Sequence, residues 1–223
     1  MNLKNLKNKK AVIIIIVILL IIGGIFYLGK EEEPKETYSQ AEEYSIIETI
    51  GGKIIENKEN RFKVQVPKDW KVEIVNDDFE MGGRVHLFNP QAELDPKTNF
   101  LIDGCGLAIM IIKNSDNLKE DAKKIREKIS NIEKQGGLIQ EKNYNQTIYN
   151  YEVAKIGNFK ALKETMILNN ETKNKIKIEQ SILLKVPVKN KIYLFETLIP
   201  NKTKDSCPQE FNNFLKIVSI NES

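Results

Sequence analysis

Hydrophobic and polar positions divide the chain into one uncharged apolar segment near its start and a longer region of short alternating runs. The segment, residues 11–28, contains nothing more polar than two glycines and a tyrosine. Its 18 residues span about 27 Å as a helix, close to the hydrocarbon thickness of a bilayer. All its faces are apolar, whereas a core helix of a globular domain would show a polar face. The pattern therefore predicts one N-terminal transmembrane helix.

Charges on either side of residues 11–28 predict the orientation of this helix. Residues 1–10 contain four lysines and no acidic residue, and three consecutive glutamates start at Glu31. Since basic flanks stay in the cytoplasm, we expect the N-terminus inside and the C-terminal part outside. The alternative is a cleaved signal peptide, whose apolar region is about 7–15 residues long and ends in small residues. The longer run, with no A-x-A pattern after it, favours an uncleaved anchor that has the lipid bilayer as its partner.

Four segments follow from this pattern. We expect a basic cytoplasmic segment at residues 1–10, the transmembrane helix at 11–28, a flexible stalk at 29–43 and one extracytoplasmic domain at 44–223. The stalk is charged and lacks large aliphatic side chains, so it cannot bury enough apolar surface to offset its chain entropy. The remainder shows no internal repeat and no second linker, as expected for a single domain.

Two amphipathic helices are predicted in the domain. Over residues 117–135 apolar positions recur at helical spacing, and a pair of glycines follows as a stop signal. A second helix is expected over residues 207–218, where Ser206 and Gln209 form a capping-box pattern. The apolar stripes are Leu118, Ala122, Ile125, Ile129 and Ile132 in the first helix and Phe211, Phe214, Leu215 and Val218 in the second.

Alternating or continuous apolar runs between polar turns predict the strands. Residues 106–113 form a nearly continuous apolar run, which suits a strand buried on both faces. Short loops between long strands favour antiparallel pairing. The expected strands are residues 61–66, 71–75, 84–88, 106–113, 138–142, 151–156, 159–168, 175–186 and 191–199. The fold class is therefore α+β, an antiparallel β-sheet flanked by helices and preceded by one transmembrane helix.

Charge disfavours nucleic acid as a partner. The formal net charge is +3, from 34 Lys+Arg and 31 Asp+Glu. Four of the basic residues precede the apolar segment and all acidic residues follow it, so the exported part carries 30 − 31 = −1. A domain so balanced has no overall field that attracts phosphates.

The beginning and end of the domain resemble a known family. An opening strand that runs into a Pro-x-x-Trp turn, RFKVQVPKDWKVEI with Pro67 and Trp70, is similar to that of PsbP-like domains. So are the central helix, the strand meander and the closing helix FNNFLKIVSI, and the resemblance covers about residues 61–220. It implies an α/β/α sandwich in which Pro67 and Trp70 form a structural turn. Family members are usually binding or assembly proteins, and no residue here matches a photosynthetic cofactor or partner.

Cys105 and Cys207 are the only cysteines, and both lie in the part expected outside the cytoplasm. Two cysteines in an exported domain more often pair than stay free. A bond between them would close a loop of about 100 residues, which chain entropy values at about 4–5 kcal/mol. We expect this disulfide, and two separate small buried residues are the alternative.

A catalytic alternative makes Cys105 a nucleophile with His86 as its base and Asp103 nearby, because a thiolate needs an adjacent imidazole for activation. His86 lies within the run Val-His-Leu-Phe, a setting typical of a surface or strand-edge residue. One histidine and two distant cysteines lack the ligand spacing of a zinc site, and the acidic turn at residues 77–80 lacks that of a calcium loop. We expect no cofactor and no metal.

These patterns predict location and fold more sharply than activity. We expect a non-catalytic, membrane-anchored binding or assembly module of the cell envelope with a PsbP-like domain. The alternative is a cell-envelope thiol hydrolase that uses Cys105 and His86. A third hypothesis is a spacer whose domain serves only to self-associate.

Overall fold

A computed structural model describes residues 37–77, 82–97, 101–113, 116–143, 146–169 and 178–221. The predicted transmembrane helix, residues 11–28, lies outside the described residues, as do the basic segment before it and residues 29–36. No helix in the described part of the chain combines the length and the apolar composition needed to cross a membrane.

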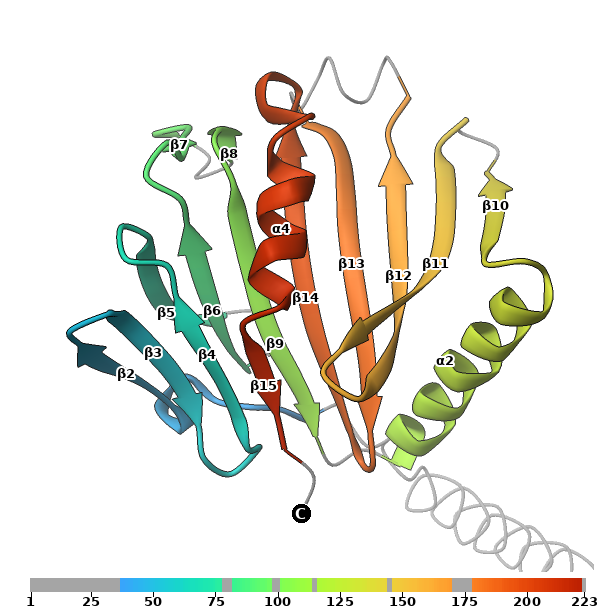
Figure 1. Ribbon diagram of the computed structural model, residues 1–223, viewed down its shortest axis with the longest axis horizontal. Coiled ribbons are helices and arrows are strands. Elements are labelled where there is room, and N and C mark those ends of the chain that lie inside the picture. The colour runs from blue at the N-terminus through green and yellow to red at the C-terminus, as the bar shows by residue number, and fades with distance from the viewer. Residues whose placement is uncertain are drawn as a thin grey trace, which may run out of the picture. The chain divides into compact units, whose positions relative to one another are not determined.

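Antiparallel strands make up most of the described residues, as the turn pattern predicts (Figure 1). The large sheet has the strand order β10-β11-β12-β13-β14-β9-β6-β5, and the short β1 pairs with β9. The apolar run of β9 is buried on both faces, as expected for a strand inside a sheet. The strands are β1 Thr37–Tyr38, β5 Lys71–Asp77, β6 Gly82–Phe88, β9 Gly106–Lys113, β10 Leu138–Lys142, β11 Ile148–Ile156, β12 Phe159–Ile167, β13 Ile178–Val188 and β14 Lys191–Pro200.

A smaller sheet with the order β15-β4-β3-β2 contains three strands that the sequence interpretation missed, β2, β3 and β15. Both β2 and β3 hold two adjacent isoleucines, which interrupts the alternation expected of a half-buried strand. They are joined through Gly52, whose φ of 124° favours glycine. The bounds are β2 Tyr44–Thr49, β3 Gly52–Asn57, β4 Phe62–Val66 and β15 Val218–Ile220, and a separate pair consists of β7 Glu93–Leu94 and β8 Leu101–Asp103.

The large sheet buries a different apolar core on each face. One core lies between this sheet, the smaller sheet and helix α4 (Cys207–Leu215), and includes Phe62, Ile109 and Phe195. The other lies beneath helix α2 (Asp116–Lys134), whose stripe packs against Ile112, Leu162 and Ile192 (Figure 1). The described residues thus contain antiparallel sheets and two α-helices, as the α+β prediction requires.

Helix α2 matches its predicted range within one residue at each end, whereas α4 ends earlier than predicted. After Leu215 the chain tightens into a turn and continues as β15, in which Val218 pairs with Val64 of β4. Val218 and Ile220 are buried and the residue between them is exposed, which is strand periodicity rather than helical periodicity. The predicted capping box was wrong, since the Ser206 side chain makes no cap hydrogen bond.

Residues 37–43, which the sequence interpretation placed in the flexible stalk, belong to the folded domain; we call them the strap. Ser39 is fully buried. Its N–H donates to the carbonyl of Ile111 at 2.9 Å, and its carbonyl accepts from the N–H of Gly83 at 2.7 Å. A Cβ at Gly83 would lie 2.3 Å from the nitrogen of Ala41, so only glycine allows the strap to lie this close.

Polar side chains also hold the strap. The amide of Asn60 donates to the hydroxyl of Ser39 at 2.7 Å and to the carboxylate of Glu43 at 3.1 Å. Glu43 also forms an ion pair with Lys113. Burial raises the pKa of Glu43, but the Gln40 N–H and the Lys113 ammonium together hold it below its usual value. The strap is therefore tied to residues far from it in the sequence, which local composition does not reveal.

Candidate functional site

A hollow lies on the α2 side of the large sheet, and its floor is formed by β9. Every second residue of β9 points to this side, and two of them, Gly106 and Ala108, are small. The neighbouring strands carry larger side chains at the facing positions, so the small residues leave a gap between them. The facing sets across β6, β9 and β14 are His86–Ala108–Glu196 and Phe88–Gly106–Leu198.

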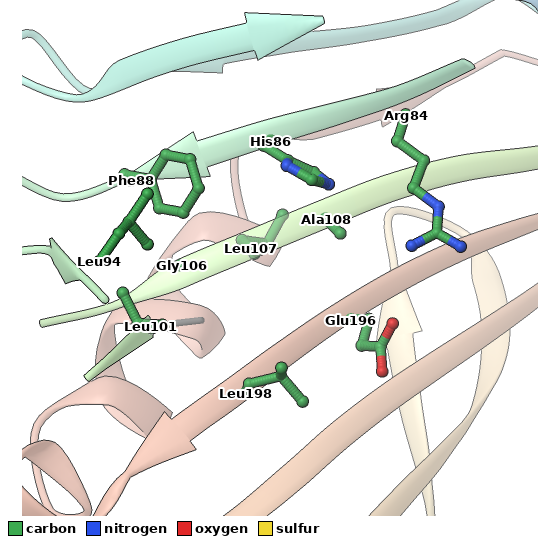
Figure 2. A pocket seen from close by; sticks show the side chains of 10 residues that line it. All are labelled: Arg84, His86, Phe88, Leu94, Leu101, Gly106, Leu107, Ala108, Glu196 and Leu198. Atoms are coloured by element: carbon green, nitrogen blue, oxygen red, sulfur yellow. The ribbon is translucent and has the colours of Figure 1, made fainter. Parts of the chain in front are cut away.

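The resulting pocket has a volume of about 250 Å³. Its apolar end is formed by Phe88, Leu94, Leu101 and Leu198 (Figure 2). A Cβ on Gly106 would lie 3.1 Å from the ring of Phe88, so the glycine lets this ring close over the floor. Such a volume is below that of pockets for drug-sized molecules, and it suits a small group or part of a larger ligand.

The other end of the pocket carries ionisable side chains. Figure 2 shows Arg84 and Glu196 at this end, with His86 between them and the apolar end. Burial raises the pKa of the Glu196 carboxyl, and the positive charge of Arg84 partly opposes that effect. The His86 ring meets Phe88 edge to face, with ring centres 6.0 Å apart. The pocket thus joins an apolar cavity to neighbouring charges of opposite sign.

The β7–β8 pair forms one wall of the pocket through Leu94 and Leu101, and it is tied to the chain before α4. Asp103 accepts a hydrogen bond from Lys202 at 3.0 Å, and the pairing lowers the pKa of Asp103. The hydroxyl of Thr203 donates to the carbonyl of Gly104 at 2.9 Å. These two hydrogen bonds therefore attach the pocket wall to the segment that leads into α4.

The disulfide between Cys105 and Cys207 completes this attachment and confirms the predicted pairing. Their Cα atoms are 5.4 Å apart, and both residues are buried in the core beneath α4. Beside the bond, Asn89 accepts from the N–H of Cys105 at 2.9 Å and donates to Glu210 at 3.0 Å. Cys105 lies two residues after the end of β8, and Cys207 is the first residue of α4. The bond therefore joins the pocket wall to α4.

The structure contradicts the proposed pairing of Cys105 with His86. Both cysteines of the chain are in the disulfide, so no thiol is left to act as a nucleophile. Cys105 packs in the core with Val85 and Leu87. His86 alternates with these two residues in β6 and therefore points to the opposite face, where it lines the pocket.

Pro67 and Trp70 form the turn that the sequence predicts. The N–H of Trp70 donates to the carbonyl of Pro67 at 3.1 Å, and the indole packs against the core beneath α4. Both residues also line a second pocket of about 370 Å³ beside α4. Its ionisable residue, Glu210, accepts a hydrogen bond from Asn89, whereas the pocket on the sheet contains the ionisable residues Arg84, His86 and Glu196.

Sequence reasoning missed Arg84 and Glu196 as members of a site. One signal was present: Gly106 and Ala108 stand at alternate positions in a strand of otherwise large apolar residues. The register that brings β6 and β14 to either side of them was not visible in the sequence. Within the described residues no group of three or more metal-ligating side chains occurs.

In comparisons with known proteins, the chain is similar to solved structures. No protein-family model and no curated protein matches the chain. The solution structure of cyanobacterial PsbP (CyanoP) from Synechocystis sp. PCC 6803 is similar, with 10% identity, 78% of this chain and 95% of that chain covered, and a TM-score of 0.39. The crystal structure of LpqN, involved in cell envelope biogenesis of Mycobacterium tuberculosis, has 11% identity, coverage of 80% and 91%, and a TM-score of 0.42.

Proposed function

We propose that this protein is a membrane-anchored, extracytoplasmic binding module that takes a ligand or a partner group into the pocket on β9. It acts without catalysis, through recognition alone. The observation that carries the proposal is the pocket itself: an apolar cavity with ionisable side chains at one end, over a floor of Gly106 and Ala108. Pockets that bind small groups combine apolar lining with a few convergent polar side chains in this way.

Two further observations support the proposal. The anchor predicted at residues 11–28 and the positive flank before it favour a domain outside the cytoplasm. A disulfide between the two cysteines suits an oxidising compartment of that kind. It also occupies the thiol that a hydrolase mechanism through Cys105 would require.

Capture in native membranes tests the binding role. A photo-crosslinking amino acid at Leu94, on the pocket wall, should yield crosslinked species from membranes that contain the full chain. Ala108→Phe, which fills the floor, should abolish these species. Ser45→Phe is the matched control, since it places the same ring on an exposed position of β2 and should leave them unchanged. Crosslinks that survive Ala108→Phe, or none above background, would argue against a binding role for the pocket.

The predicted topology has its own test. A C-terminal tag should be digested by protease added to intact cells whose wall has been removed. A tag that stays protected in those cells, yet is cleaved after lysis, would place the domain inside and refute this part of the proposal.

A further inference from the structure

The two ends of the pocket differ in chemistry, and this difference restricts the ligand. We propose that the pocket binds an acyl chain of about eight carbons that carries a neutral amide head group. This inference rests on the proposed binding function and narrows it to one ligand class. The chain would lie against Phe88, Leu94 and Leu101, and the head would lie between Arg84 and Glu196 (Figure 2).

The chain length follows from the volume of the cavity. An apolar cavity of about 150 Å³ holds benzene, which has six carbons. By the same proportion about 250 Å³ holds about ten heavy atoms, which is a chain of about eight carbons together with the oxygen and nitrogen of an amide head. Each buried methylene should strengthen binding about fourfold, so an aliphatic chain gains most from this lining.

The head group follows from the charges. Arg84 and Glu196 line the same end of the pocket, and the positive charge of Arg84 partly opposes the effect of burial on the pKa of the Glu196 carboxyl. An anionic head group would be attracted by Arg84 but repelled by Glu196. A cationic head group would be attracted by Glu196 but repelled by Arg84. Either would also lose its hydration on entry. A neutral amide has an acceptor for the guanidinium and a donor for the carboxylate, so it satisfies both side chains.

The experiment compares three probes with equal chains: octanamide, octanoate and octylamine. The full chain is reconstituted in nanodiscs of zwitterionic lipid, and each probe is equilibrated by dialysis at neutral pH. Partition into the lipid is removed by subtracting the binding to Ala108→Phe nanodiscs, in which the pocket floor is filled. We expect octanamide to bind at least about tenfold more tightly than either charged probe, a difference of about 1.4 kcal/mol.

A second variant tests the charge argument. Glu196→Gln removes the negative charge but keeps the shape of the side chain. The affinity for octanoate should therefore rise about tenfold relative to the affinity for octanamide. Equal binding of the three probes, tighter binding of octanoate to the unaltered protein, or no binding above the Ala108→Phe level would each overturn the inference. The crosslinking experiment uses none of these probes, so it judges the binding function separately.

Discussion

Loss of the Cys105–Cys207 bond should destabilise the domain by several kcal/mol. The two cysteines are 102 residues apart in the sequence. In the chain-entropy treatment, a loop of this size contributes about 4.7 kcal/mol at 25 °C, because the bond restricts the unfolded chain. For a domain of this size each kcal/mol corresponds to about 2–4 °C in Tm, so we expect a decrease of about 9–19 °C.

The assay is thermal unfolding of the full chain with Cys105→Ala, Cys207→Ala and both changes together. Either single change removes the whole crosslink. The double variant should therefore be only slightly less stable than each single variant, by the loss of one more buried sulfur. Adding the two single effects would overestimate the double effect by about the value of the crosslink. Reductant should bring the unaltered protein to the level of the double variant and leave that variant unchanged.

Two results would refute this reasoning. Additive single effects would mean that the cysteines act as separate buried side chains. An unaltered Tm in reductant, with both thiols shown by alkylation to be free, would mean that the bond contributes nothing to stability. A decrease in Tm without loss of crosslinks at Leu94 would further show that the pocket wall holds its position without the bond.

Three further predictions concern the strap and the pocket. Glu43→Gln should cost about 1–3 kcal/mol at neutral pH, because the ammonium of Lys113 then loses its closer carboxylate and retains the more exposed Glu59 at 3.4 Å. The pKa of Glu43 is lowered on folding, so this loss should disappear in acid, which a series of Tm measurements against pH would show. Glu196→Gln should instead raise the Tm at neutral pH, because burial raises the pKa of Glu196 and its ionisation opposes folding as pH rises. Gly83→Ala should destabilise the domain by about 1–3 kcal/mol by forcing the strap away, whereas Gly51→Ala, which meets only the end of a flexible side chain, should change the Tm little.

Each of these predictions has its own outcome that would contradict it. A Glu43→Gln variant as stable as the unaltered protein at neutral pH would mean that the ion pair with Lys113 does not help to hold the strap. A lower Tm for Glu196→Gln would mean that ionised Glu196 stabilises the fold through Arg84. Equal effects of alanine at positions 83 and 51 would show that the close approach of the strap is unimportant.

Much of the secondary structure was predictable because it depends on local periodicity. The stripe of α2 recurs at helical spacing, and its end follows from Gly136 and Gly137, where the N–H of Gly137 donates to Ile132 at 2.9 Å. Errors occurred where local pattern was ambiguous. Val218 continues the stripe of α4 but belongs to β15, where it pairs with Val64 of β4 and is buried.

The candidate site was less predictable, because its residues meet only through strand register. Gly106 and Ala108 indicate a gap in a packed face, but the side chains that surround it come from β6, β14 and the β7–β8 pair. The strap shows the same limit, since Glu43 finds its ionic partner 70 residues later in the chain.

The sequence by itself determined the helices, most of the long strands, the candidate pair of cysteines and the apolar segment at residues 11–28. These features depend on neighbouring residues or on composition, so they can be recognised in the amino-acid sequence alone. Tertiary structure alone decided that residues 37–43 join the fold and that His86 and Cys105 lie on opposite faces. It also decided that Arg84 and Glu196 share one pocket. Each of these depends on which distant strands pair and in which register, and a shift of one residue would turn every side chain of a strand to the other face.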